Sequence, residues 1–301
     1  MVSLSAPYTK VYHSSHTFVV RDNHDRILAI FAARPDGADW DECHQSALEA
    51  YDRFAATPGA LSDDMFRRGE FATLSAGVSY GGGQTVRRLH CMWNFPDVLE
   101  HPSIIRLAGF ANGVFANYAP KLYAYYVDTL GPLFAKLPSL KLPFANSIFT
   151  AVSFNFGPKA ISWCHLDGGN VPFGLCAITS LGSFDATKGG HLYMWELGLV
   201  VEFPAGALAL ITSGGVHHGN TPIQPGERRA SLVQYCSGGL FRYVLYGFRT
   251  AAKFMRQDRK GKKEFDAGLA DRWRACLAFF SKSSELAQDL NEVFGVGIDV
   301  E

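Results

Sequence analysis

The sequence predicts an α+β protein in which a β-sandwich or β-barrel is flanked by helices. Residues 144–250 contain short apolar or alternating runs separated by glycine, proline and polar turns, a pattern typical of antiparallel strands. Apolar residues recur at helical spacing before this segment, and charged helical stretches follow it. We therefore expect an N-terminal hairpin and helical region over residues 1–143, a β core over residues 144–250 and a C-terminal helical segment over residues 251–301.

The N-terminal region is predicted to begin with a β-hairpin and to continue with helices. The runs HTFVVRD and ILAIFAA are separated by the turn-like DNHD, which favours a hairpin within residues 10–35. Asp39 precedes WDECHQSALEAYDRFAA, whose apolar spacing predicts a helix of about four turns. Residues 102–134 return to helical spacing, punctuated by Pro120 and Pro132. The stretch SAGVSYGGGQTVRR lacks the lysine and hydroxyl residue of a phosphate-binding loop, so we interpret it as a structural turn.

Seven runs in the central region are predicted to be strands. Their short length and the turns between them favour a sandwich or barrel over alternating strand–helix units. They are SIFTAVSFNF, FGLCAITSL, HLYMWEL, LVVEFP, ALALITS, ASLVQYC and FRYVLYGF. After Arg249, the stretches AAKFMRQDRKGKKEF and ADRWRACLAFFSKSSELAQDLNEVF predict a charged helical tail.

The composition narrows the class of protein. Hydrophobic residues make up 48% and charged residues 19%, which supports a sizeable core and argues against general disorder. Lys+Arg and Asp+Glu balance at 28 each, so overall charge gives no argument for binding nucleic acid or an anionic membrane. The six cysteines form no C-x-x-C pair, and we expect them to be reduced. The chain shows neither a signal peptide nor an apolar run of about 20 residues, so we expect an intracellular protein, nuclear or cytoplasmic, with no membrane partner.

Residues with metal-ligating side chains gather in the strand-rich region. His165 and Asp167 are two positions apart, and side chains at that spacing point to the same face of an extended strand. His217 and His218 follow farther along the chain, in VHHGN. Two histidines and one carboxylate form the facial triad of non-haem iron(II) oxygenases, which leaves coordination positions open. The spacing therefore predicts a metal site.

An arginine and a hydroxyl residue follow these histidines. Arg229 stands on a predicted strand, where its guanidinium can bind a carboxylate bidentately if it is buried. Ser231 lies two positions later and would face the same way. Each of these residues is commonplace alone, and Arg229 could be an exposed strand residue. The order H-x-D, then GGHL at 189–192, V-x-F-P-A-G at 201–206 and H-x10-R-x-S favours one functional site.

The residues that carry a wider resemblance lie within 145–250. They are AVSFNFGP, CHLDGGNVPFGLCAITSLGSFDATKGGHLYMWEL and HGNTPIQPGERRASLVQYCSGGLFRYV. These stretches resemble the double-stranded β-helix (jelly-roll) 2-oxoglutarate dioxygenases, and more narrowly the fungal group related to the TET/JBP methylcytosine dioxygenases. The resemblance implies a jelly-roll core flanked by helices, and an oxidoreductase that uses Fe(II), 2-oxoglutarate and O2.

The resemblance also assigns roles to single residues. It implies that His165, Asp167 and His218 hold the metal and form the catalytic centre, and that Arg229 with Ser231 binds 2-oxoglutarate. His217 competes with His218 for the metal. Alternation places the two on opposite faces, and the spacing to Arg229 together with the family pattern favours His218. We interpret His191 as a strand residue near the site rather than a ligand.

Two further positions match residues that contact the target base in the TET enzymes. Asn170 occupies the position of an asparagine or aspartate that hydrogen-bonds the base, and Tyr235 that of an aromatic residue that stacks on it. The alternative for Asn170 is a turn residue, and for Tyr235 core packing. Where the TET enzymes carry a histidine eight residues after the co-substrate arginine, this chain has Ser237, a departure that leaves the substrate class open.

Three functions remain possible at this stage. The first is hydroxylation of a methyl group on a DNA base, 5-methylcytosine or N6-methyladenine, with methylated DNA as the partner. The second is the same chemistry on a protein side chain or small metabolite, and the third is a jelly-roll binding module without catalysis. The basic stretch 253–263 is a candidate phosphate contact, or else a solvated segment between helices, and Arg87-Arg88 is a weaker candidate.

Overall fold

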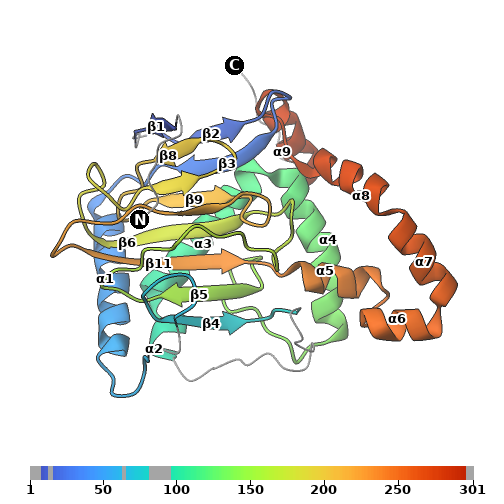
Figure 1. Cartoon of the computed structure of the whole chain (residues 1–301), viewed down its shortest axis with the longest axis horizontal. Coiled ribbons are helices and arrows are strands. Elements are labelled where there is room, and N and C mark those ends of the chain that lie inside the picture. The colour runs from blue at the N-terminus through green and yellow to red at the C-terminus, as the bar shows by residue number, and fades with distance from the viewer. Residues whose placement is uncertain (1–7, 13–15, 63–65, 81–95, 296–301) are drawn as a thin grey trace.

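A computed structural model describes residues 8–12, 16–62, 66–80 and 96–295 (Figure 1). Arg87-Arg88 and most of the glycine-rich stretch lie outside these described residues. Within the described part of the chain, two β-sheets form the core. None of the helices in that part combines the length and the apolar character that crossing a lipid bilayer requires.

The larger sheet contains seven strands among the described residues, and all of its pairings are antiparallel. In spatial order they are β2 (Phe18–Arg21), β3 (Ile27–Ala32), β9 (Leu208–Ile211), β6 (Cys176–Ser183), β11 (Arg228–Tyr235), β5 (Ala151–Asn155) and β4 (Thr73–Gly77). The expected N-terminal hairpin is β2–β3, and β3 joins β9, so the hairpin extends the sheet.

The smaller sheet contains four strands in the described residues. In spatial order they are β1 (Thr9–Val11), β8 (Leu199–Val201), β7 (Leu192–Met194) and β10 (His218–Asn220). Between β6 and β11 the chain passes to the smaller sheet, back to the larger one, and across twice more. In the smaller sheet β8–β7 and β7–β10 are antiparallel, and β1 pairs with β8 in parallel. Alternation between two facing, mainly antiparallel sheets is the jelly-roll arrangement. The predicted α+β fold, a jelly-roll core flanked by helices, is confirmed.

Each face of the larger sheet is covered by a different layer. On one face, buried residues of β3, β6 and β9 pack against Leu192, Met194 and Val201 of the smaller sheet. On the other face, helices α1 (Ala38–Ala55) and α3 (Pro102–Tyr118) lie behind the sheet in Figure 1 and pack on β4, β5 and β11. The space between the two sheets is therefore where we look for the predicted metal and co-substrate residues.

The remaining helices surround this core at its sides. They are α2 (Pro96–Leu99), α4 (Pro120–Lys136), α5 (Gly238–Leu245), α6 (Ala251–Gln257), α7 (Arg259–Ala267), α8 (Leu269–Cys276) and α9 (Leu286–Phe294), with short 3-10 turns at Leu277–Phe279 and Ser283–Glu285. Helices α6, α7 and α8 project from the body as an arm, on the right of Figure 1. The predicted C-terminal helical tail is thus present.

One predicted strand is wrong. The run FRYVLYGF was expected to be extended, but the structure has helix α5 there. The Ser237 side chain accepts a hydrogen bond from the Gly239 N–H and caps the helix. Leu240 and Phe241 are buried, and the Phe241 ring packs against Tyr126 of α4. A run of eight mostly apolar residues suits either a strand or a buried helix, and here the cap and the packing decide.

Strand β11 sends alternate side chains to the two faces of the larger sheet. Ala230 and Leu232 are buried beneath the helices, whereas Arg229, Ser231 and Tyr235 line a cavity on the opposite face. The alternation of this one strand therefore brings the predicted co-substrate and substrate residues to the same space.

Candidate functional site

The two candidate histidines are paired through their backbones. The N–H of His165 donates to the carbonyl of His218, and the N–H of His218 donates to the carbonyl of His165, each over 3.0 Å. His165 belongs to an isolated bridge rather than a full strand, but the local antiparallel pairing is the same. Because the two residues are directly opposite, their rings lie side by side with centroids 4.3 Å apart.

The tautomer of each histidine is set by a backbone carbonyl. The Nδ1 atom of His165 lies 2.7 Å from the Trp163 carbonyl oxygen, and that of His218 lies 3.0 Å from the Val216 carbonyl oxygen. A carbonyl oxygen only accepts, so Nδ1 carries the proton in both rings and Nε2 keeps its lone pair. Such contacts orient histidine ligands in metal sites.

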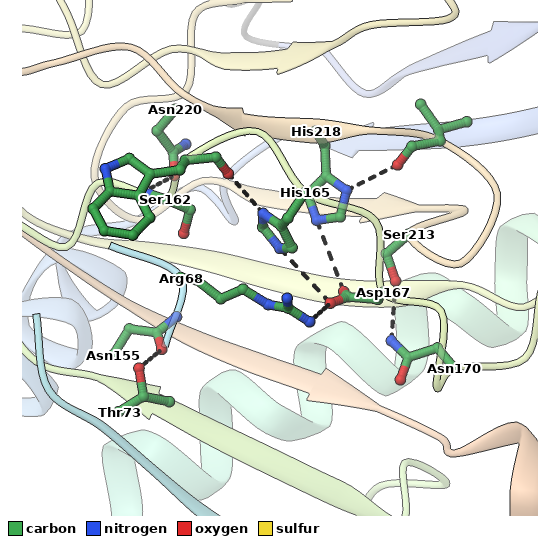
Figure 2. Close-up of polar contacts among 12 residues, drawn as sticks. Arg68, Thr73, Asn155, Ser162, His165, Asp167, Asn170, Ser213, His218 and Asn220 are labelled. Atoms are coloured by element: carbon green, nitrogen blue, oxygen red, sulfur yellow. Dashed lines mark hydrogen bonds and ion pairs between the residues drawn. The ribbon is translucent and has the colours of Figure 1, made fainter. Parts of the chain in front are cut away.

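Asp167 completes the set of ligands. Its carboxylate oxygens lie 3.7 Å from the Nε2 of His165 and 3.8 Å from the Nε2 of His218 (Figure 2). The ligand atoms of all three residues lie within 4.8 Å of one another. The Asp167 N–H donates to the Ser213 carbonyl over 3.0 Å, which fixes the turn after His165. Two neutral nitrogens and one carboxylate are a donor set that suits a divalent iron ion.

The protonation of the histidines favours metal binding. Burial, with a smaller contribution from His165, lowers the pKa of His218 to about 4. Burial also lowers the pKa of His165. Both rings are therefore neutral near pH 7, the form in which an imidazole binds a metal ion.

Arg229 carries a positive charge at the buried end of the cavity. Its side chain is 1% exposed, and burial lowers its pKa to about 10, so the guanidinium stays charged at neutral pH. One Nη donates to the Ala160 carbonyl over 2.5 Å, and the Phe184 ring lies 6.0 Å away. The Nε has no hydrogen-bond partner, and no carboxylate of the described residues forms an ion pair with Arg229. A buried cation without an anion is costly, so this position suits a ligand carboxylate.

Ser231 is held beside Arg229 by a chain of polar contacts. Its hydroxyl accepts a hydrogen bond of 3.0 Å from the side-chain NH2 group of Asn155. The side-chain oxygen of Asn155 in turn accepts one of 3.0 Å from the Thr73 hydroxyl. Ser75 and Ser153 form a further hydroxyl pair at 2.7 Å. All five residues line the cavity, so its β4–β5–β11 wall is polar.

The predicted substrate residues lie in the same cavity. The Asn170 amide donates to the Ser213 hydroxyl over 3.1 Å, and Tyr235 is half-buried at the end of β11. Ser237 also lines the cavity, but its hydroxyl donates to the Tyr80 carbonyl over 2.5 Å and caps α5. At the position where the TET enzymes carry a base-reading histidine, this chain thus has a structural hydroxyl.

The two histidines set aside by the sequence analysis do not join the triad. His217 is exposed, and its Nδ1 lies 2.5 Å from a carboxylate oxygen of Glu196. His191 is half-buried, and its Nδ1 lies 3.0 Å from the Thr221 hydroxyl. Neither belongs to the group of ligand atoms around Asp167.

Sequence reasoning missed Arg68, which contacts a predicted ligand. Its Nη donates to Asp167 over 2.9 Å, as Figure 2 shows, from a position 99 residues earlier in the chain. The Arg68 carbonyl accepts a hydrogen bond of 2.7 Å from the Trp163 N–H, which ties this bend to the segment before His165. No motif in the surrounding FRRGE points to the contact, because only the tertiary fold brings the two segments together.

A cavity of about 570 Å³ unites these residues. Its lining includes every predicted site residue: His165, Asp167, Asn170, His218, Arg229, Ser231 and Tyr235. The cavity thus places a metal-binding triad, a buried cation and two polar or aromatic groups around one space. That arrangement suits a metal ion, a chelating carboxylate ligand and a third molecule.

Replacing one of two adjacent histidines tests the assignment of the metal ligands. We expect His218→Ala to weaken binding of Co(II), used in place of iron, by at least about 100-fold, since even loss of an outer partner of a ligand costs up to that much. His217→Ala is the matched control and should bind Co(II) as the unchanged protein does. Isothermal titration calorimetry measures both. Equal losses in the two variants would contradict the assignment.

The pH dependence of metal binding tests the lowered pKa values. Two ordinary histidines, with a pKa of about 6.5, would together weaken binding about 100-fold between pH 7.5 and 5.5, because protons compete for both. With the pKa of His218 near 4, its contribution disappears in this range. We therefore expect Co(II) affinity to fall by no more than about 10-fold over this interval. A fall of about 100-fold would show that the histidines titrate normally.

The chain was compared with family models, curated proteins and solved structures. No family model matches the sequence, and no curated protein matches it. The chain is similar to NgTET1 in complex with 5mC DNA (15% identity, 77% of this chain and 83% of that chain, TM-score 0.44). It is also similar to a Pseudomonas putida prolyl-4-hydroxylase (19% identity, 69% of this chain and 91% of that chain, TM-score 0.36). A third similar structure is an oxidoreductase of the 2OG-Fe(II) oxygenase family from Burkholderia pseudomallei (15% identity, 69% of this chain and 84% of that chain, TM-score 0.39).

Proposed function

We propose that this chain is an Fe(II)- and 2-oxoglutarate-dependent dioxygenase that hydroxylates a methyl group of a DNA base. One observation carries the chemistry. The three ligand atoms around Asp167 and the buried, unpaired guanidinium of Arg229 share a single cavity. A chelating keto acid needs both features, a metal for its keto-acid end and a cation for its far carboxylate.

The proposed reaction converts a methyl group, dioxygen and 2-oxoglutarate into a hydroxymethyl group, succinate and carbon dioxide. One oxygen atom of O2 enters a C–H bond of the methyl group, and the other enters the new carboxylate of succinate. The reduction of both oxygen atoms takes four electrons. Two come from the C–H bond that is oxidised, and two come from the oxidative loss of carbon dioxide from 2-oxoglutarate. Bound iron would supply the redox chemistry that activates dioxygen.

The protein residues position the reactants. His165, Asp167 and His218 would hold the metal. Arg229 would bind the far carboxylate of 2-oxoglutarate, and the Ser231 hydroxyl, held by Asn155, would add a hydrogen bond. These contacts exclude water from the buried end and fix the co-substrate before the methyl group arrives.

The DNA-base assignment rests on the resemblance to the TET/JBP group and on two residues of the cavity. Asn170 would hydrogen-bond the flipped base and Tyr235 would stack on it, since both line the same space as the triad. The basic stretch 253–263 covers most of α6 and the first part of α7, where Lys262 pairs with Asp266 and Lys260 with Glu264. The remaining cations on this arm would contact phosphates.

An oxygen-triggered assay tests the proposed function. The protein is purified without oxygen and loaded with iron(II) and 2-oxoglutarate. Oxygen is then admitted in the presence of methylcytosine-containing, methyladenine-containing or unmodified DNA. We expect succinate to rise with one methylated DNA, in equal amount to a hydroxymethyl base measured by mass spectrometry. Succinate that forms equally with every DNA, and is lost in His165→Ala, would contradict the DNA assignment and favour a protein or metabolite substrate. No succinate under any condition would favour a binding module.

Two neighbouring arginines allow a matched test of co-substrate binding. Arg229→Gln should raise the KM for 2-oxoglutarate by about 10- to 100-fold, since a charged hydrogen bond contributes about 1.5–3 kcal/mol. Arg228→Gln is the control, because Arg228 points to the helix side and pairs with Asp52 of α1. Its KM should stay within about twofold of the unchanged protein. Steady-state kinetics with varied 2-oxoglutarate measure both. An unchanged KM in Arg229→Gln would remove the assignment.

A further inference from the structure

The solvent side of the cavity is lined by arginines. Arg67, Arg68 and Arg242 are exposed lining residues, whereas Arg229 lines the buried end. Among the described lining residues Asp167 is the one carboxylate, and it belongs to the metal-binding triad. Arg68 contacts that carboxylate, while Arg67 and Arg242 form no ion pair within the described ranges. The exposed end of the site therefore carries excess positive charge.

This excess remains after the co-substrate is counted. A divalent metal and Arg229 would bring three positive charges, and Asp167 and the dicarboxylate 2-oxoglutarate would bring three negative ones, so these charges cancel. Summed over the cavity, the three exposed arginines therefore leave a net excess of positive charge, although Arg68 itself contacts Asp167. A site of this kind favours a third molecule that is itself an anion.

Two glycines keep the same side of the cavity free of side chains. Gly168 and Gly169 directly follow Asp167 and line the cavity. A Cβ atom built on either residue would meet nothing within 4 Å. Neither glycine has a positive φ, so the backbone conformation does not demand glycine there. Because the two glycines lack side chains, the space beside Asp167 stays open.

Backbone hydrogen bonds fix these features relative to the metal site. The Gly238 N–H, at the start of α5, donates to the Gly169 carbonyl over 3.0 Å, and α5 carries Arg242. The bend that carries Arg67 and Arg68 is tied to Trp163, two residues before His165. We call Arg67, Arg68, Arg242, Gly168 and Gly169 the rim. Its cations come from two separate segments of the chain and line the same cavity as the two glycines.

We propose that the rim holds the phosphodiester backbone of a nucleic acid strand beside the base to be oxidised. This inference rests on the proposed function and assigns its substrate contacts to particular residues. A strand carries an anion at every nucleotide, so it can meet cations on both elements at once. The bare backbone at Gly168-Gly169 leaves room for the sugar and phosphate that stay outside when the base enters the cavity.

The salt dependence of strand binding tests the two free arginines. The iron-free full-length protein is titrated with a fluorescent 12-nucleotide single-stranded DNA at several salt concentrations. Each lost phosphate contact should reduce the slope of log affinity against log salt by about 0.7. We expect this reduction in Arg67→Gln and in Arg242→Gln. Arg53→Gln, an exposed change on α1 at the opposite face of the larger sheet, is the control and should keep the slope. Unchanged slopes in both rim variants would overturn the proposal.

A free mononucleotide separates a strand from a small anion. If the mononucleotide binds as tightly as the 12-nucleotide strand, and Arg67→Gln and Arg242→Gln weaken both equally, the rim binds a single small anion and the strand proposal is overturned. We expect the strand to bind at least 10-fold more tightly, because several phosphates contribute.

A bulky replacement tests the bare backbone. Gly169→Leu should weaken strand binding by at least about 10-fold, because its side chain would stand in the space left for the sugar and phosphate. Gly113→Leu on α3, where a Cβ also meets nothing within 4 Å, is the control and should not weaken it. Equal strand affinity in Gly169→Leu and the unchanged protein would contradict this part of the rim.

Failure of the rim and failure of the proposed function give different results. All rim measurements are of binding, without iron or oxygen. Reduced salt slopes without oxidation of any methylated DNA would support the rim and contradict the proposed substrate. Oxidation of methylated DNA with unchanged slopes would support the proposed function and overturn the rim.

Discussion

A guanidinium that is 1% exposed carries its charge to the buried end of the cavity, where water cannot solvate it. The fold keeps it there, because β11 lies between β6 and β5 and its backbone is hydrogen-bonded on both sides. The Ala160 carbonyl and the Phe184 ring stabilise the charge only in part, and Nε is left without a partner. A ligand carboxylate would remove this cost, so the position of Arg229 suits an acidic ligand.

The three candidate metal ligands, His165, Asp167 and His218, are the second feature that limits which ligand suits the cavity. The reciprocal backbone hydrogen bonds of His165 and His218 set two nitrogen ligands side by side, and carbonyl oxygens at Trp163 and Val216 hold both rings in the same tautomer. Such contacts orient histidine ligands in metal sites. Arg229 lies on β11 of the larger sheet, whereas His218 lies on β10 of the smaller sheet with His165 paired to it. Together they suit a ligand with a carboxylate at each end.

The sequence predicts the parts of this site that follow from alternation along a strand. His165 and Asp167 are two positions apart, as are Arg229 and Ser231, and the members of each pair line the same cavity. Tyr235, predicted from the family resemblance, lies an even number of positions farther along β11 and lines it too. It does not predict Arg68, whose contact with Asp167 depends on tertiary packing across 99 residues. It also misassigns residues 241–248, because capping by Ser237 and burial of Leu240 and Phe241 outweigh a pattern that suits a strand equally well. Local periodicity thus predicts the core strands, whereas contacts between distant segments are found only in the structure.

A crystal structure grown without oxygen, with manganese(II) in place of iron and with 2-oxoglutarate, tests the central claim most directly. We expect one manganese ion bound by the Nε2 atoms of His165 and His218 and by the Asp167 carboxylate. We also expect the far carboxylate of 2-oxoglutarate to bind Arg229 and Ser231. A metal bound by other side chains, or 2-oxoglutarate bound away from Arg229, would contradict it.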